Sequence, residues 1–78
     1  MQPDELKTVI EEGIPGAQVD VKGDGDHFEA TIVSDTFEGK SMVQQHQLVY
    51  SALGDLMKGA VHALSFRTFT TTEWSKQL

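Results

Sequence analysis

Histidines are the residues of this chain best suited to hold a metal centre. His27 and His62 each stand at the start of a segment in which apolar and polar residues alternate. Imidazole is a common metal ligand, and the chain has no cysteine from which to build a thiolate site. Whether the two rings can reach one metal centre depends on how the segments that carry them are arranged.

Alternating apolar residues predict three strands, at residues 17–21, 27–33 and about 62–69. The glycine-rich stretch KGDGD lies between the first two, which is typical of an antiparallel hairpin. Some 28 residues separate the second strand from the third, enough for a helical crossover to a parallel neighbour.

Helices are expected at residues 3–12, in two pieces over 41–59, and in a short segment after Thr70. Ser41 with Gln44 and Thr70 with Glu73 have the spacing of capping boxes. The order is therefore αββααβα. We expect an α+β fold in a single domain over residues 1–78, with a three-stranded mixed sheet and helices on one face.

Parallel pairing of the second and third strands would bring their N-terminal ends to one edge of the sheet. Neighbouring strands lie about 4.8 Å apart, so His27 and His62 could then reach one ion or cluster. The alternative is that His62 lies on the same strand face as Leu64, two residues later, and borders the core, while His27 is a solvated turn residue. Spacing alone favours this alternative. A zinc site needs three or four protein ligands, so a metal centre here would need further ligands from a partner.

His46 lies in the middle of a predicted helix, among Met42, Val49 and Leu53. We expect it to pack against the sheet with its polar edge hydrogen-bonded, rather than to bind a metal. Two other motifs have simple interpretations. DVKGDGD lacks the EF-hand ligands at loop positions 3 and 12 and is interpreted as a turn. The GIPG at 13–16 carries no basic residue and joins a helix to a strand.

Charge and length limit the function classes. Twelve acidic residues against six basic ones give a formal net charge of -6, which disfavours nucleic acid as the main partner. A chain of 78 residues has little room for an enclosed active site beside its core, which disfavours an enzyme. No apolar run approaches the length of a membrane span, and the acidic N-terminus is unlike a signal peptide. We expect a soluble, cytoplasmic protein without a membrane partner.

Several stretches resemble the BolA-like proteins in order: GDGDHFEATIVS, FEGKSMVQQHQLVYSAL, VHALSFRTFT and the closing TEW. The second resembles the family pattern F-x-G-K-x-x-V-x-R-H-R. The resemblance implies the BolA fold, similar to a type II KH domain without its GxxG loop. It also implies a partner, the CGFS-type monothiol glutaredoxins, with which such proteins bridge a [2Fe–2S] cluster.

In such complexes the glutaredoxin cysteine and glutathione supply thiolates, and the BolA-like protein supplies a histidine at the position of His62. A second ligand comes from the loop before the second strand, where this chain has His27. The resemblance therefore implies a non-enzymatic protein that helps to traffic or sense clusters, with no cofactor expected for the isolated chain. Arg67 is a candidate for the surface that docks the partner.

The alternative function is a DNA-binding transcriptional regulator of stress response and cell morphology, with Lys40 and Lys58 at the nucleic-acid surface. The chain departs from the family pattern here, since glutamines in QQHQ at 44–47 replace the arginines that usually flank the helical histidine. This change, with the net charge, predicts weak DNA binding at best. A homodimer and a purely structural scaffold stay open.

Overall fold

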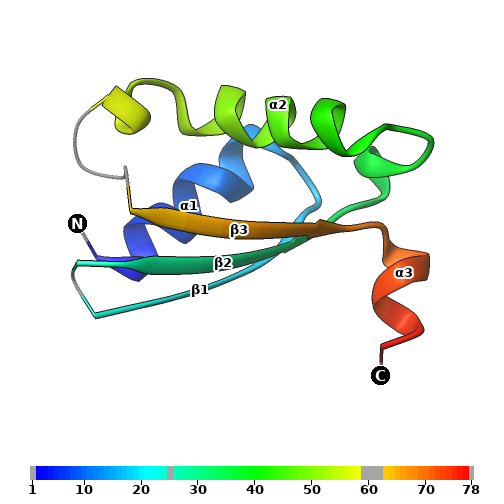
Figure 1. The fold of residues 1–78 in the computed structure, drawn as a ribbon, viewed down its shortest axis with the longest axis horizontal. Coiled ribbons are helices and arrows are strands. Elements are labelled where there is room, and N and C mark those ends of the chain that lie inside the picture. The colour runs from blue at the N-terminus through cyan, green and yellow to red at the C-terminus, as the bar shows by residue number, and fades with distance from the viewer. Residues whose placement is uncertain (1, 25, 59–62, 78) are drawn as a thin grey trace.

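The computed structural model describes residues 2–24, 26–58 and 63–77 of the chain. The expected order of elements is confirmed, and the second piece of the long helical region is a 3-10 helix. The bounds are α1 (Pro3–Gly13), β1 (Gln18–Gly23), β2 (Phe28–Val33), η1 (Asp35–Phe37), α2 (Met42–Leu53), η2 (Gly54–Lys58), β3 (Leu64–Phe69) and α3 (Thr71–Ser75) (Figure 1).

The three strands form one mixed sheet in the order β1-β2-β3. β1 runs antiparallel to β2, with Val19 opposite Ile32. β2 runs parallel to β3, with Phe28 opposite Leu64. The predicted hairpin and the predicted parallel crossover are both confirmed, and β3 forms one edge of the sheet.

Both predicted capping boxes are present. The Ser41 hydroxyl accepts from the Gln44 N–H at 3.2 Å, and the Gln44 side chain accepts from the Ser41 N–H at 2.9 Å. Thr70 and Glu73 repeat the arrangement at 3.1 and 2.8 Å. α2 ends at Gly54, whose φ of +54° favours glycine, and the chain continues as η2.

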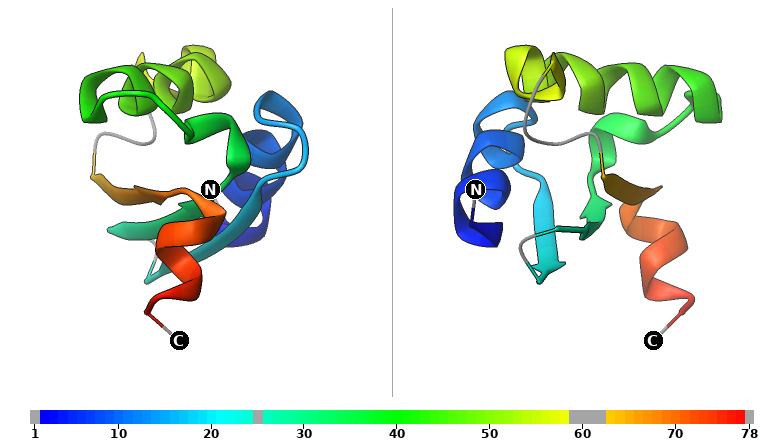
Figure 2. Two further views of the ribbon diagram at one scale, coloured as in Figure 1. Left: turned by 90° about the vertical axis from the view of Figure 1, so that its right-hand side faces the viewer. Right: turned by 60° about the vertical axis from the view of Figure 1, so that its left-hand side comes forward.

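The core lies between the sheet and α1 and α2, which cover the same face, as Figures 1 and 2 show. α1 and α2 pack closely, since a Cβ on Gly13 would collide with Ala52. Every other residue of each strand points into this core because side chains alternate along a strand. The buried cluster comprises Leu6, Ile10, Ile14, Val19, Phe28, Ala30, Ile32, Phe37, Val49 and Leu53.

Among the described elements, only α3, which follows β3, lies at the other face of the sheet (Figure 1). The Phe69 and Trp74 rings lie 5.2 Å apart between centroids, which fixes α3 at the C-terminal end of β3. Trp74 reaches the open face, where it lines a small hollow with β1 and β2. In the described part of the chain, no helix is long and apolar enough to cross a membrane.

Candidate functional site

His27 is an exposed residue whose backbone is held by the turn before β2. Its N–H donates to Asp24 Oδ1 at 3.0 Å, and the Asp26 N–H donates to the same oxygen at 2.9 Å. The N–H of His27, followed by that of Asp26, stabilises the ionised carboxylate and lowers the pKa of Asp24. Phe28, the next residue, is buried in the core. The turn and the core therefore hold the backbone of His27 while its imidazole remains accessible.

The start of β2 lies beside the start of β3. The Phe28 N–H donates to the carbonyl of Ala63 at 3.2 Å, and Phe28 is opposite Leu64 in the parallel register. The parallel neighbours on which the two-histidine hypothesis depends are thus present. His62 precedes Ala63 in the sequence and lies outside the described residues, so its joint ligation with His27 stays a prediction.

The possible metal ligands in the described part of the chain could form part of a metal site but not a complete one. Residues 2–24, 26–58 and 63–77 contain no group of three or more histidine or carboxylate side chains that could hold a metal ion. One accessible imidazole beside the start of β3, in a chain without cysteine, is compatible with a site completed by another molecule.

His46 has different surroundings. Its ring is half-buried and meets the Phe66 ring edge-on, with centroids 4.8 Å apart and an interplanar angle of 64°. Tyr50 meets the same ring at 5.6 Å and 79°. The expected packing against the sheet is confirmed. The expected hydrogen bond is not found, because no described residue bonds to the ring nitrogens of His46, and aromatic contacts take its place.

A buried polar contact between α2 and β3 was not predicted from the sequence. The Thr68 hydroxyl donates to Gln45 Oε1 at 2.7 Å, and Gln45 Nε2 donates to the Lys40 carbonyl at 2.9 Å. Thr68 lies two residues after Phe66 and therefore on the same face of the strand, which was the sequence signal that it faces α2. Gln45 is 7% exposed, so only Gln47 of the two glutamines that replace family arginines changes the charge of the surface.

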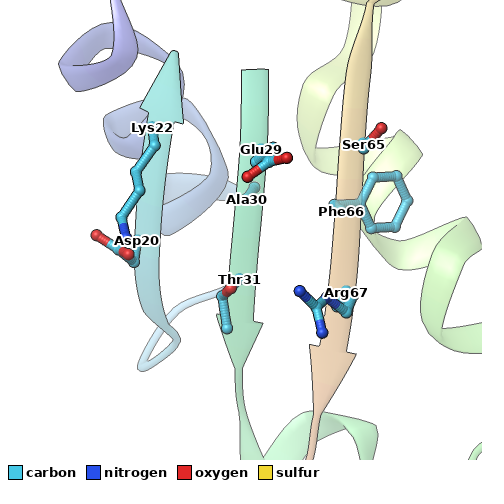
Figure 3. A pocket seen from close by; sticks show the side chains of 8 residues that line it. All are labelled: Asp20, Lys22, Glu29, Ala30, Thr31, Ser65, Phe66 and Arg67. Carbon is cyan, nitrogen blue, oxygen red and sulfur yellow. The ribbon is translucent and has the colours of Figure 1, made fainter. Parts of the chain in front are cut away.

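Arg67 lies on the open face, in a shallow hollow of about 310 Å³ lined by all three strands. Figure 3 shows its guanidinium turned across the sheet toward Thr31, while the Lys22 side chain runs along β1 toward Asp20. No ion pair to Arg67 is present among the described residues. The predicted docking residue is therefore exposed and accessible.

The two lysines predicted for nucleic acid lie at opposite ends of α2. Lys40 precedes the helix and donates its Nζ to the Thr36 carbonyl at 2.8 Å. Lys58 ends η2, and its side chain lies outside the described part of the structure. A helix of twelve residues is about 18 Å long, so the chain does not gather these residues into one patch.

Comparison with known proteins agrees with the fold. The family described as BolA-like protein matches residues 5–73. The chain is 32% identical to the acid stress protein IbaG of Escherichia coli, over 97% of this chain and 92% of that protein. It is 36% identical to the DNA-binding transcriptional regulator BolA of Vibrio cholerae, over 96% of this chain and 68% of that protein. A solved bolA protein homologue from Coxiella burnetii superposes with a TM-score of 0.87 and 41% identity, covering 96% of this chain and 97% of that one.

Proposed function

The chain belongs to the BolA-like family, and from this premise we propose that it is a non-enzymatic partner of a CGFS-type monothiol glutaredoxin. Together the two proteins hold a bridging [2Fe–2S] cluster, which this chain helps to traffic or sense. His62 and His27 are the ligands from this chain. The glutaredoxin cysteine and glutathione supply the thiolates that a chain without cysteine lacks.

The observation that carries the proposal is the exposed imidazole of His27 at the start of β2, next to the strand that follows His62. The hydrogen bonds of the turn orient the backbone of His27 without using its side chain. A [2Fe–2S] centre with two histidine and two cysteine ligands is a known type of site, found in Rieske proteins. Neutral imidazoles leave less negative charge on such a cluster than thiolates do, which raises its reduction potential.

Reconstitution tests this proposal. The full chain is mixed with a CGFS-type glutaredoxin, glutathione, iron and sulfide, and the visible absorption and circular dichroism are recorded. A new spectrum, different from that of the glutaredoxin alone, is expected for the wild type. We expect His62→Ala to abolish it, and His27→Ala to shift or weaken it.

His46→Ala is the matched control, because it removes an imidazole that packs on Phe66. It should leave the spectrum of the complex unchanged. A His62→Ala chain that folds, by far-ultraviolet circular dichroism, and still gives the wild-type cluster spectrum would overturn the assignment of His62.

A second candidate function is DNA binding, supported by the name of the Vibrio cholerae relative. The net charge of -6 and the separation of Lys40 from Lys58 predict weak binding. Fluorescence anisotropy with duplex DNA should show binding that falls steeply between about 50 and 200 mM salt. Tight binding that persists at the upper salt concentration and is lost in Lys40→Glu would favour this function over the first.

A further inference from the structure

Within residues 2–24, 26–58 and 63–77, the backbone groups along the outer edge of β3 have no partner strand. β3 pairs with β2 alone, and the carbonyls of Ala63 and Phe69 accept from β2 and from the residue that follows it, at 3.2 and 3.0 Å. Backbone groups alternate in direction along a strand, so residues 65 and 67 also face β2. The N–H and C=O groups that face away from the sheet belong to Leu64, Phe66 and Thr68.

α2 overhangs this edge without closing it. The helix packs on α1, and it meets β3 through side chains, by the rings of His46 and Tyr50 on Phe66 and by the Gln45–Thr68 hydrogen bond. Figure 3 shows the Phe66 ring pointing away from β2. A groove of about 380 Å³ remains between helix and strand, which we call the α2–β3 groove. Its lining consists of Met42, His46, Phe66, Arg67, Thr68 and Phe69.

α2 carries exposed apolar side chains near the α2–β3 groove. Met42, which lines the groove, is 58% exposed, and Tyr50, whose ring meets Phe66, is 48% exposed; Val43, elsewhere on the helix surface, is 67% exposed. In the described part of the chain, these are the large hydrophobic residues that are exposed, and all three belong to α2. An apolar surface next to an open strand edge is the arrangement by which sheets accept an extended peptide as an additional strand.

The charged side chains at the α2–β3 groove indicate which class of partner could bind there. The chain has twelve acidic and six basic residues, yet no carboxylate lines the α2–β3 groove; Arg67 lines it and turns its guanidinium onto the open face of the sheet (Figure 3). Arg67 makes no ion pair with a described residue. An occupant paired along β3 that places an acidic side chain on the open face near Arg67 (Figure 3) and an apolar one in the groove against Phe66 would match both properties.

We propose that the α2–β3 groove binds an extended segment of a partner protein, in which apolar residues alternate with at least one Asp or Glu, as a fourth strand along β3. Side chains of one parity enter the groove below α2, and those of the other parity lie on the open face. This inference does not rest on the cluster proposed above, since it uses neither His27 nor His62, although it shares Arg67 with the surface predicted to dock the glutaredoxin.

Two other occupants fit less well. A second copy of this chain paired along β3 would bring another Arg67 and no carboxylate from that strand. A nucleic acid would meet one arginine in the groove and the field of a molecule with net charge -6. Each is an outcome that would contradict the proposal.

Selection from a random peptide library tests the proposal directly. A phage-displayed library of dodecapeptides is selected on the full chain and, in parallel, on Arg67→Glu. Peptides enriched on the wild type should alternate apolar residues with Asp or Glu, and should bind Arg67→Glu about tenfold or more weakly. Lys22→Glu is the matched control, because it makes the same charge change at an exposed site on β1, the opposite edge strand. It should change the affinity less than about twofold.

Backbone pairing is tested with N-methylated versions of one selected peptide. Methylation of alternate amides should abolish binding for one parity and leave it nearly intact for the other, because only one parity faces β3. Amide exchange should slow at residues 64, 66 and 68 in the complex. Failure to enrich any peptide, equal binding by Arg67→Glu, or equal sensitivity of both methylated parities would overturn the proposal. So would displacement of the peptide by single-stranded DNA, or dimerisation of the free chain that Phe66→Ala abolishes.

Discussion

His27 and His46 show how two regions of one small sheet give the same side chain different roles. His27 lies in an exposed turn, where local hydrogen bonds to Asp24 hold its backbone and its side chain is exposed. His46 lies in α2, where its ring meets Phe66 at 4.8 Å and helps to hold the helix over β3. The first arrangement leaves a donor available to a partner, and the second uses the ring for packing.

The two regions also differ in what stabilises them. Contacts between α2 and β3 join residues at least sixteen positions apart in the sequence, and one of them is a buried hydrogen bond. The contacts of the Asp24–His27 turn span three residues at most and are exposed. Substitutions in the α2–β3 region should therefore lower the free energy of unfolding, while those in the turn should affect chiefly local geometry and ligand binding.

The largest effect on stability is expected for Thr68→Val, which is nearly isosteric but removes the hydroxyl that donates to Gln45 Oε1. Leaving that buried oxygen without its donor should lower the free energy of unfolding by about 1–3 kcal/mol, measured by urea denaturation. Thr31→Val is a suitable control, because Thr31 is half-buried on the other face of the sheet and its hydroxyl makes no hydrogen bond with a described residue. Equal losses in the two variants would contradict the importance of the buried contact.

A smaller effect is expected for His46→Ala. Loss of the edge-on contact with Phe66 should lower the free energy of unfolding by about 1 kcal/mol. His46→Phe should restore most of it, since a ring of similar size keeps the contact without the imidazole nitrogens. The comparison between the two histidines would fail if His46→Phe changed the cluster spectrum as strongly as His27→Ala.

The smallest effect concerns Asp24, whose pKa is lowered by the N–H groups of His27 and Asp26. Because the pKa is lower in the folded than in the unfolded state, the stabilisation is present above the usual value of 3.8 and is lost as the pH falls through the folded pKa. An NMR titration should place the Asp24 midpoint below 3.8. Asp24→Asn should flatten the pH dependence of unfolding in this acidic range and nowhere else. An unchanged slope in Asp24→Asn would contradict the role of the ionised carboxylate.

Local patterns were sufficient to predict most of the fold. Alternation gave the three strands, and the Ser41 and Thr70 capping boxes marked the starts of α2 and α3, because these signals depend on neighbours in sequence. The 28-residue connection was enough to predict that β2 and β3 are parallel. The hydrogen bond predicted for His46 is not found among the described residues, and the aromatic contact with Phe66 was not foreseen, since a helix pattern does not reveal which ring of a distant strand lies opposite.

The Gln45–Thr68 contact escaped prediction for a similar reason. Gln45 and Thr68 are polar, and alternation patterns predict polar positions to be exposed. The two side chains are buried and hydrogen-bonded only because α2 packs close to β3. Arg67 was predicted to be exposed at a docking surface, but its position beside the α2–β3 groove depends on which strand forms the edge of the sheet. Long-range geometry of this kind has no signature in a single sequence.

The most direct test of the cluster proposal is pulsed electron paramagnetic resonance of the reduced complex. The chain is labelled with ¹⁵N only in its histidine rings and is mixed with unlabelled glutaredoxin, glutathione, iron and sulfide. The proposal predicts nitrogen couplings to the cluster that change from ¹⁴N to ¹⁵N with the label, lose one set in His27→Ala, and persist in His46→Ala. A cluster that shows no coupling sensitive to the label on this chain would contradict histidine ligation by this protein.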